Sequence, residues 1–245
     1  MDISVKRDGL VLRGDLLRPN NLKTPVAIIF HGLMSKRGSI KLTDVLLEHG
    51  IAVAQFDFNG HGKSDGDFSD MNVYNEILDA AKIMDYVRNL DFVTDIYVIG
   101  NSQGALVGGM IAGFYREYVK KLVMLAPAAT IKDDAQRGVC FGIPYDIYNI
   151  PEHITMTNIE NEKFNIGGLY FRLARTLPIY ETTSMFEGET LIIHGSADEV
   201  VGVIGSKRYV ECMKNTTLEI VDGENHGLNN FAWNDIVKKV LDFLK

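Results

Sequence analysis

The sequence predicts an α/β fold with a doubly wound, mostly parallel sheet. The first observation is a set of six short apolar runs, rich in β-branched residues, that recur along the 245-residue chain. Near-continuous apolar runs are typical of parallel strands that are buried on both faces. The second observation is that helical patterns separate these runs. Strands that alternate with helices form right-handed crossovers, which place helices on both faces of one sheet.

The six expected parallel strands are each followed by a glycine or a polar turn. A further pair of strands precedes them, because residues 4–7 and 10–17 flank Asp8 and Gly9, a pair typical of a tight turn. We expect this hairpin to be antiparallel and to lie at the edge of the sheet. The six parallel strands are expected at residues 26–30, 51–56, 96–99, 122–125, 190–193 and 218–221.

The clearest helical pattern covers residues 72–89. Apolar side chains at positions 73, 77, 80, 81, 84 and 87 fall on one face at helical spacing. Asn72 is a suitable N-cap, because its side-chain oxygen can accept a hydrogen bond from an amide of the first turn. Further helices are expected at residues 40–48, 103–116, 206–214 and 230–244.

One segment interrupts the alternation of strands and helices. Residues 128–188 are far more than one crossover helix requires, and they show little clean periodicity. We interpret them as an inserted cap over the carboxyl edge of the sheet, so that residues 1–127 and 189–245 form the α/β core. The alternative is a set of extra helices packed on the flank of the sheet.

Composition excludes several classes of protein. Apolar residues make up 46% of the chain and charged residues 23%, which is ordinary for a folded globular enzyme. The formal net charge of −7 argues against nucleic acid as a partner and against attraction to an anionic membrane. The first eight residues lack the apolar region of a signal peptide, and the apolar stretch 105–115 is too short to span a bilayer. We therefore expect a soluble, cytoplasmic protein.

The string G-N-S-Q-G at residues 100–104 predicts a nucleophilic serine, Ser102. It follows an expected strand and opens an expected helix, which is the context that gives a G-x-S-x-G string its meaning. The turn is so sharp that side chains two positions on either side of Ser102 would collide, so glycine is needed there. The positive end of the helix dipole can then stabilise a developing anion.

A serine hydroxyl needs a base to remove its proton, and the order expected on this fold is serine, acid, histidine. Asp198 follows the strand at 190–193, and His226 follows the last strand. Both therefore reach the same edge of the sheet as Ser102, as an orienting acid and a base. Two rival carboxylates are weaker, because Glu199 precedes an apolar run and Asp222 comes too early in its loop.

Two backbone amides are expected to bind the oxyanion. One is the amide of Gln103, directly after the nucleophile, and the other is that of Leu33, in the loop after the strand at 26–30. His31 in that loop, and the glycine-rich string at 57–64, are interpreted as structural. We expect no cofactor and no metal site, because the histidines form no H-E-x-x-H or clustered pattern. Cys140 and Cys212 form no disulfide framework.

The sequence resembles the α/β-hydrolase superfamily and, more narrowly, the bacterial feruloyl (cinnamoyl) esterases. The resemblance implies an α/β-hydrolase fold with a cap, the Ser102, Asp198 and His226 triad, and hydrolysis of hydroxycinnamate esters without a cofactor. Apart from Asp198 and His226, the similar strings lie at residues 31–33, 57–65, 100–104, 126–129, 150–151, 167–172 and 177–181.

The same resemblance implies an acyl pocket in the cap, where an acid and a tyrosine bind the hydroxyl groups of the aromatic ring. By motif these residues are Asp134 and Tyr170. Two positions depart from the family. Asn101 stands where a histidine is common, and Phe141 stands where a polar glutamine is expected, so a preference for caffeoyl-type rings is in doubt.

The leading prediction is a serine carboxylic-ester hydrolase that acts on a small ester with an aromatic acyl group. The alternatives are a general short-chain esterase, a thioesterase or lipase-like hydrolase, and, outside the enzymes, a ligand-binding receptor on the same fold. Labelling by a fluorophosphonate probe separates the receptor, which needs no activated serine. A homodimer is compatible with the sequence, which leaves the oligomeric state open.

Overall fold

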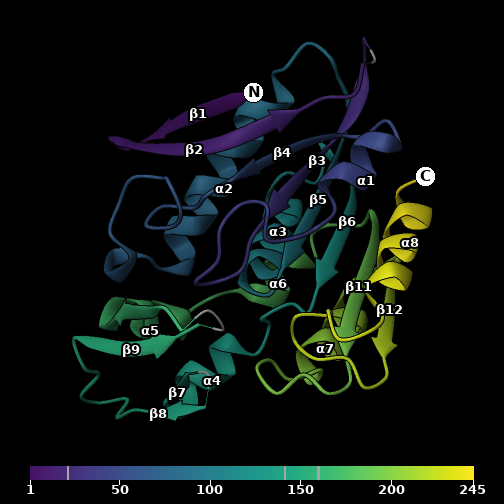
Figure 1. Ribbon diagram of the computed structural model, residues 1–245. Coiled ribbons are helices and arrows are strands. Elements are labelled where there is room, and N and C mark those ends of the chain that lie inside the picture. Colours follow the sequence, from purple (N-terminus) through teal and green to yellow (C-terminus); the bar gives the residue numbers. More distant parts are fainter. Residues whose placement is uncertain (21, 141, 159–160) are drawn as a thin grey trace.

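An eight-stranded sheet forms the centre of the computed structural model, which describes residues 1–20, 22–140, 142–158 and 161–245 (Figure 1). Its order is β1-β2-β4-β3-β5-β6-β11-β12. The last six strands of that order run parallel, whereas β2 is antiparallel to both β4 and β1. The strands are β1 (Asp2–Arg7), β2 (Leu10–Leu17), β3 (Thr24–Phe30), β4 (Ala52–Phe56), β5 (Val93–Asn101), β6 (Val119–Leu125), β11 (Glu189–Gly195) and β12 (Thr216–Val221). The predicted α/β fold, with its mostly parallel sheet and antiparallel edge hairpin, is confirmed.

Both faces of the sheet are buried, as the continuous apolar runs predict. Along β3, Val26, Ile28 and Phe30 belong to one hydrophobic cluster, whereas Ala27 and Ile29 belong to the other. Helices α2 (Val73–Arg88), α3 (Gln103–Phe114) and α7 (Ile204–Cys212) contribute to the first cluster. Helices α1 (Thr43–Glu48) and α8 (Trp233–Leu244) contribute to the second. The sheet is therefore the middle of three layers.

Helix α2 begins as predicted. Asn72 is its N-cap, and the side-chain oxygen of Asn72 accepts a hydrogen bond from the Asn75 amide at 3.0 Å. Five of the six predicted apolar positions are buried and Ala81 is half-buried, and the buried face also carries Glu76 and Asp79. Two carboxylates on a buried helix face need hydrogen-bond or ion-pair partners. One of them, Glu76, accepts a hydrogen bond from Gln103, the residue after Ser102.

Between β6 and β11 the chain forms several small elements. These are α4 (Ile131–Arg137), β7 (Val139–Cys140), β8 (Ile143–Pro144), β9 (His153–Thr157), β10 (Lys163–Gly167), α5 (Gly168–Ala174) and α6 (Ile179–Thr183). In Figure 1, α4, α5 and β9 lie beyond the end of the sheet to which the arrowhead of β6 points. Helix α6 instead packs on α3, and β10 packs on the short 3-10 helix η1 (Phe68–Asp70). The division of the chain at residues 128 and 188 stays a prediction.

Several predicted boundaries were wrong by a few residues. The helix predicted at 40–48 begins only at Thr43, because Ile40 and Leu42 reach the core from a preceding turn. Similarly, α7 lies two residues before its predicted position and α8 begins three residues later. Among the described residues, no helix combines the length and apolar character that crossing a membrane requires.

Candidate active site

Ser102 lies at the sharp turn between β5 and α3. Its φ of 54° and ψ of −122° are strained for a residue with a side chain. A Cβ atom at Gly100 would overlap the backbone of Gly104, and a Cβ atom at Gly104 would overlap the carbonyl group of Phe30. Glycine at both positions therefore allows the turn, which presents the serine hydroxyl at the carboxyl edge of the sheet.

Ser102, His226 and Asp198 form a chain of hydrogen bonds, although they are far apart in the sequence. The ring Nε2 of His226 lies 2.9 Å from Ser102 Oγ, and its Nδ1 lies 2.7 Å from Asp198 Oδ2. The three residues follow the carboxyl ends of β5, β12 and β11, so the parallel sheet brings them together. In this arrangement the imidazole can remove the hydroxyl proton while the carboxylate fixes its tautomer.

The Asp198 carboxylate is held from several sides. Its Oδ1 accepts hydrogen bonds from the amides of Val200 and Val201, each at 2.8 Å. Burial raises the pKa of Asp198, but the hydrogen bonds from His194 and His226 and the Val201 amide outweigh burial and hold the pKa below its ordinary value. The carboxylate therefore stays ionised when the imidazole beside it becomes protonated.

His194 is a second histidine on this carboxylate, and its role was missed at the level of sequence. Its Nε2 lies 3.0 Å from Asp198 Oδ2, and its Nδ1 lies 2.7 Å from the Ser206 hydroxyl. The His194 side chain is fully buried. The available signal was its position near the end of a buried strand, four residues before the acid. That position directs a polar side chain toward the edge of the sheet that carries the nucleophile.

Glu224 holds the loop that carries His226. Its buried carboxylate accepts the amides of Asn230, Phe231 and Ala232 at 3.1, 2.8 and 2.6 Å. Burial raises the pKa of Glu224, but these hydrogen bonds outweigh burial and lower the pKa. The amides lie at the start of α8, where the helix dipole also favours a negative charge.

The two amides that the sequence predicts as oxyanion donors both belong to segments next to Ser102. Gln103 is the first residue of α3. The loop with Leu33 approaches the nucleophile so closely that a Cβ atom at Gly32 would lie 3.2 Å from Ser102 Cβ. The structure therefore brings both segments to the nucleophile, while the binding of an oxyanion by these amides stays a prediction.

Buried polar contacts fix the loop that carries Leu33. The Nε2 atom of His31 accepts the Phe58 amide at 3.0 Å, and burial lowers the pKa of His31 to about 4, so the ring is neutral. Asp57 accepts the amides of Arg37 and Lys63 at 2.7 and 2.9 Å. These contacts join the loops after β3 and β4, which agrees with the structural interpretation of His31 and of residues 57–64.

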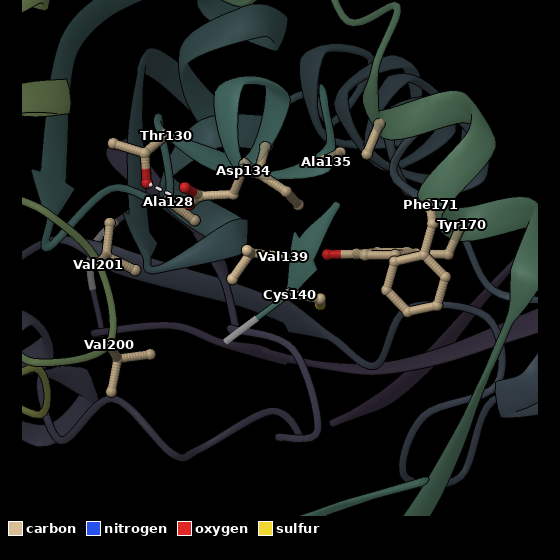
Figure 2. Close-up of a pocket in the computed structure, with 12 residues that line it drawn as sticks. Ala128, Thr130, Asp134, Ala135, Val139, Cys140, Tyr170, Phe171, Val200 and Val201 are labelled. Carbon is tan, nitrogen blue, oxygen red and sulfur yellow. Dashed lines mark hydrogen bonds between the residues drawn. The ribbon is translucent and has the colours of Figure 1, made fainter. Parts of the chain in front are cut away.

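A narrow pocket lies between α4, β7, α5 and the loop after β11 that carries Val200 and Val201 (Figure 2). Two lining residues connect it to the triad: the Ala128 amide donates to the Ser102 carbonyl at 3.0 Å, and the Val201 amide donates to Asp198. Its cavity volume is about 30 Å³. The lining residues are Ala128, Thr130, Ile131, Asp134, Ala135, Val139, Cys140, Tyr170, Phe171, Ala174, Val200 and Val201.

Asp134 and Tyr170 lie on walls of this same pocket. The Asp134 carboxylate turns toward Thr130, whose hydroxyl donates to it at 2.9 Å (Figure 2). The Tyr170 hydroxyl points toward the middle of the pocket and donates to Gln103 Oε1 at 2.6 Å. Burial raises the pKa of Tyr170 well above 10, so its hydroxyl keeps the proton that it donates. Phe141, the third predicted pocket residue, lies outside the described residues.

Comparison with solved structures of the same fold identifies the family to which this chain belongs. The chain is similar to Est1E from Butyrivibrio proteoclasticus with ferulic acid bound, at 32% identity over 99% of this chain and 97% of that chain, with a TM-score of 0.91. A second Est1E structure gives 29% identity over 99% and 97% of the two chains, with a TM-score of 0.88. The chain belongs to the α/β-hydrolases.

Residues 23–143 of this hydrolase also match the family described as serine aminopeptidase, S33. A putative hydrolase from Agrobacterium vitis S4, at 17% identity over 100% and 98% of the two chains, shares the fold with a TM-score of 0.83. No curated protein sequence gives a significant match. Family and fold together make the protein a serine hydrolase of the esterase type.

The rival carboxylates do not contact His226 in this hydrolase. Asp222 accepts a hydrogen bond from the Ser196 hydroxyl at 3.0 Å, and Glu199 is exposed. Burial raises the pKa of Cys140 to about 12, so the pocket thiol stays protonated. In the part of the chain that the structure describes, no three side chains of His, Cys, Asp or Glu are grouped to hold a metal ion.

Proposed function

We propose that this hydrolase cleaves hydroxycinnamate esters through an acyl-enzyme on Ser102. The observation that supports the proposal is a pocket with mostly apolar walls that include Tyr170, and two of its lining residues, Ala128 and Val201, are hydrogen-bonded to Ser102 and Asp198. A phenylpropenoyl group requires a long apolar slot with a few polar groups at its far end. The ferulic acid in the Est1E structure supports the same class of acyl group, because Est1E is similar over nearly the whole chain.

The arrangement of the site supports a two-stage reaction. His226 removes the proton from Ser102, whose oxygen attacks the ester carbonyl carbon and forms a tetrahedral intermediate. The amides of Leu33 and Gln103 stabilise the oxyanion, and His226 then protonates the leaving alcohol. Water, activated by the same imidazole, attacks the acyl-enzyme and releases the acid. Asp198 stays ionised throughout and stabilises the imidazolium.

Tyr170 and Asp134 are proposed to bind the hydroxyl group of the aromatic ring. Because the Tyr170 proton is directed to Gln103, its oxygen offers a lone pair to a donor in the pocket. The Asp134 carboxylate is an acceptor as well, provided that it turns away from Thr130 and Arg137, which both donate to it. A phenolic ring hydroxyl is a donor and fits both groups, whereas an unsubstituted ring offers no donor to either of them.

The size of the pocket favours a second candidate, an esterase for acetyl or other short acyl groups. A cavity of about 30 Å³ holds a small acyl group far more readily than a phenylpropenoyl group, for which the walls must separate. The wall elements α4, α5 and the loop with Val200 and Val201 come from different parts of the chain, so they can separate without breaking the sheet.

A series of methyl esters with different acyl groups distinguishes the two candidates. We expect methyl ferulate and methyl coumarate to exceed methyl butyrate in kcat/KM by at least about tenfold, which corresponds to about 1.4 kcal/mol. Keeping the alcohol constant assigns the difference to the acyl pocket. A preference for the acetate or butyrate ester would establish the short-chain candidate instead. Ser102→Ala protein, measured in parallel, corrects for hydrolysis that does not involve the site.

A further inference from the structure

A buried chain of polar side chains connects the acyl pocket with helix α2, behind the nucleophile. The Tyr170 hydroxyl donates to Gln103 Oε1 at 2.6 Å, and Gln103 Nε2 donates to Glu76 Oε2 at 2.8 Å. The three residues lie on α5, α3 and α2, and each is about 1% exposed. Both polar atoms of the Gln103 carboxamide therefore have a partner that water cannot replace.

Glu76 differs from the other buried acids of this region. Asp79, one turn later on α2, accepts hydrogen bonds from Asn59 and pairs with Arg7, whereas no ion pair of the described residues includes Glu76. Burial raises the pKa of Glu76 to about 8, and the nearby Asp79 adds to the rise. Glu76 is therefore a neutral acid at pH 7, because a buried carboxylate without a cation is costly.

We infer that Glu76 is a positioning residue that acts through Gln103. By holding the Gln103 carboxamide, Glu76 fixes the first residue of α3, whose amide is the proposed oxyanion donor. Through the same carboxamide it also fixes the Tyr170 hydroxyl in the pocket. The inference rests on the proposed function only in that Ser102 must be the nucleophile of an ester hydrolysis. It does not require an aromatic acyl group.

The hydrolase is expected to be most active while the Glu76 carboxyl group is neutral. Ionisation above about pH 8 places a negative charge beside Gln103, and the transition state gains negative charge on the other side of the same residue. Like charges in a buried site repel strongly, so kcat should fall as the pH rises. Among the described residues, the other titratable groups that interact with Glu76 are Asp79 and Tyr170. Tyr170 stays protonated in this range, and Asp79 pairs with Arg7.

The pH dependence of kcat tests this inference with p-nitrophenyl acetate, after subtraction of the uncatalysed rate. For the wild-type protein we expect a fall of at least about threefold between pH 7 and pH 9.5. Glu76→Gln keeps an acceptor for Gln103 but cannot ionise, so this fall should disappear. Glu187→Gln, a matched change at an exposed ion pair with Lys214, should retain it. A flat wild-type profile, or the same fall in Glu76→Gln, would overturn the inference.

A second variant separates positioning from charge. Glu76→Met leaves Gln103 Nε2 with only its weak contact to Met71 Sδ at 3.8 Å. We expect kcat at pH 7 to fall about tenfold, with most of the loss restored in Glu76→Gln. Tyr170→Phe removes the other contact of the same carboxamide, so its effect on kcat should not add fully to that of Glu76→Met. Full additivity would contradict coupling through Gln103. If Glu76→Met does not fold, the pH profile of kcat for Glu76→Gln decides whether the inference holds.

These tests are independent of the acyl group that the hydrolase prefers. A serine esterase of either proposed specificity cleaves p-nitrophenyl acetate, so failure on methyl ferulate would overturn the proposed substrate class and leave the role of Glu76 to be judged on its own. Conversely, an unchanged profile in Glu76→Gln, together with a preference for ferulate, would overturn only the role of Glu76.

Discussion

At the scale of single residues, we expect the strained turn at Ser102 and the imidazole of His226 to make the serine hydroxyl reactive. Replacement of Ser102 by alanine removes the attacking oxygen and should lower kcat by roughly 10⁵- to 10⁶-fold, as serine knockouts do in other triads. Steady-state kinetics on any cleaved ester measures the loss. A Ser102→Ala protein that kept a tenth of the wild-type activity would show that another group is the nucleophile.

Asp198→Asn tests the orienting acid. The amide retains the volume of the carboxylate but favours the wrong tautomer of His226, so kcat should fall roughly 10⁴-fold. Asp222→Asn is the matched control, because Asp222 lies in the same pair of loops and bonds only to Ser196 among the side chains described. An active Asp198→Asn protein together with an inactive Asp222→Asn protein would show that Asp222, and not Asp198, orients His226.

Tyr170→Phe tests the polar end of the pocket. The change removes the oxygen proposed to accept the ring hydroxyl, and the loss of such a hydrogen bond corresponds to about 1–3 kcal/mol. It also breaks the contact with Gln103, which affects every substrate. The measured quantity is therefore the ratio of kcat/KM for methyl coumarate to that for methyl cinnamate. We expect this ratio to fall, and an unchanged ratio would show that Tyr170 does not bind the ring hydroxyl.

At the scale of elements, the loop between β12 and α8 depends on Glu224, which accepts three amides of the loop. Glu224→Gln should lower the free energy of unfolding at pH 7 by about 1–3 kcal/mol, since a buried charge-assisted acceptor is lost. It should also lower kcat, because His226 lies in this loop. Glu219→Gln, at an exposed pair with Lys239, should change stability by less than about 1 kcal/mol.

The pH dependence of that stability difference has a definite sign. The pKa of Glu224 is lower in the folded than in the unfolded protein, so its contribution is present above the unfolded value of about 4.3 and is lost as the pH falls through the folded value. Denaturant unfolding of the wild type and Glu224→Gln should therefore differ most at neutral pH and converge in acid. A constant difference down to pH 3 would contradict this assignment.

The elements that the sequence predicted well are those with one simple pattern. The central strands are apolar on both faces, and α2 combines an amphipathic stripe with the N-cap Asn72. The segment between β6 and β11 was predictable only as an interruption. Its helices have five to seven residues and two of its strands have only two, which is too short for a hydrophobic period to appear.

At the scale of the whole molecule, the parallel sheet explains why the triad could be predicted and its support could not. Residues at the carboxyl ends of parallel strands converge, so the G-x-S-x-G string at Ser102 could be matched with Asp198 and His226 from the order of the strands. His194, Glu224 and Glu76 act through side-chain contacts within the folded core. No local motif records such contacts. The width of the pocket likewise depends on how α4, α5 and the loop at Val201 pack.

Trapping the acyl-enzyme tests the central claim most directly. The hydrolase is mixed with methyl ferulate, quenched in acid within milliseconds to seconds, digested and examined by mass spectrometry. We expect one peptide, the one that contains Ser102, to gain the mass of a feruloyl group. The signal should rise before steady state and be missing in the Ser102→Ala protein. Rapid hydrolysis of methyl ferulate with no such adduct, or with the adduct on another residue, would contradict the mechanism proposed for this site.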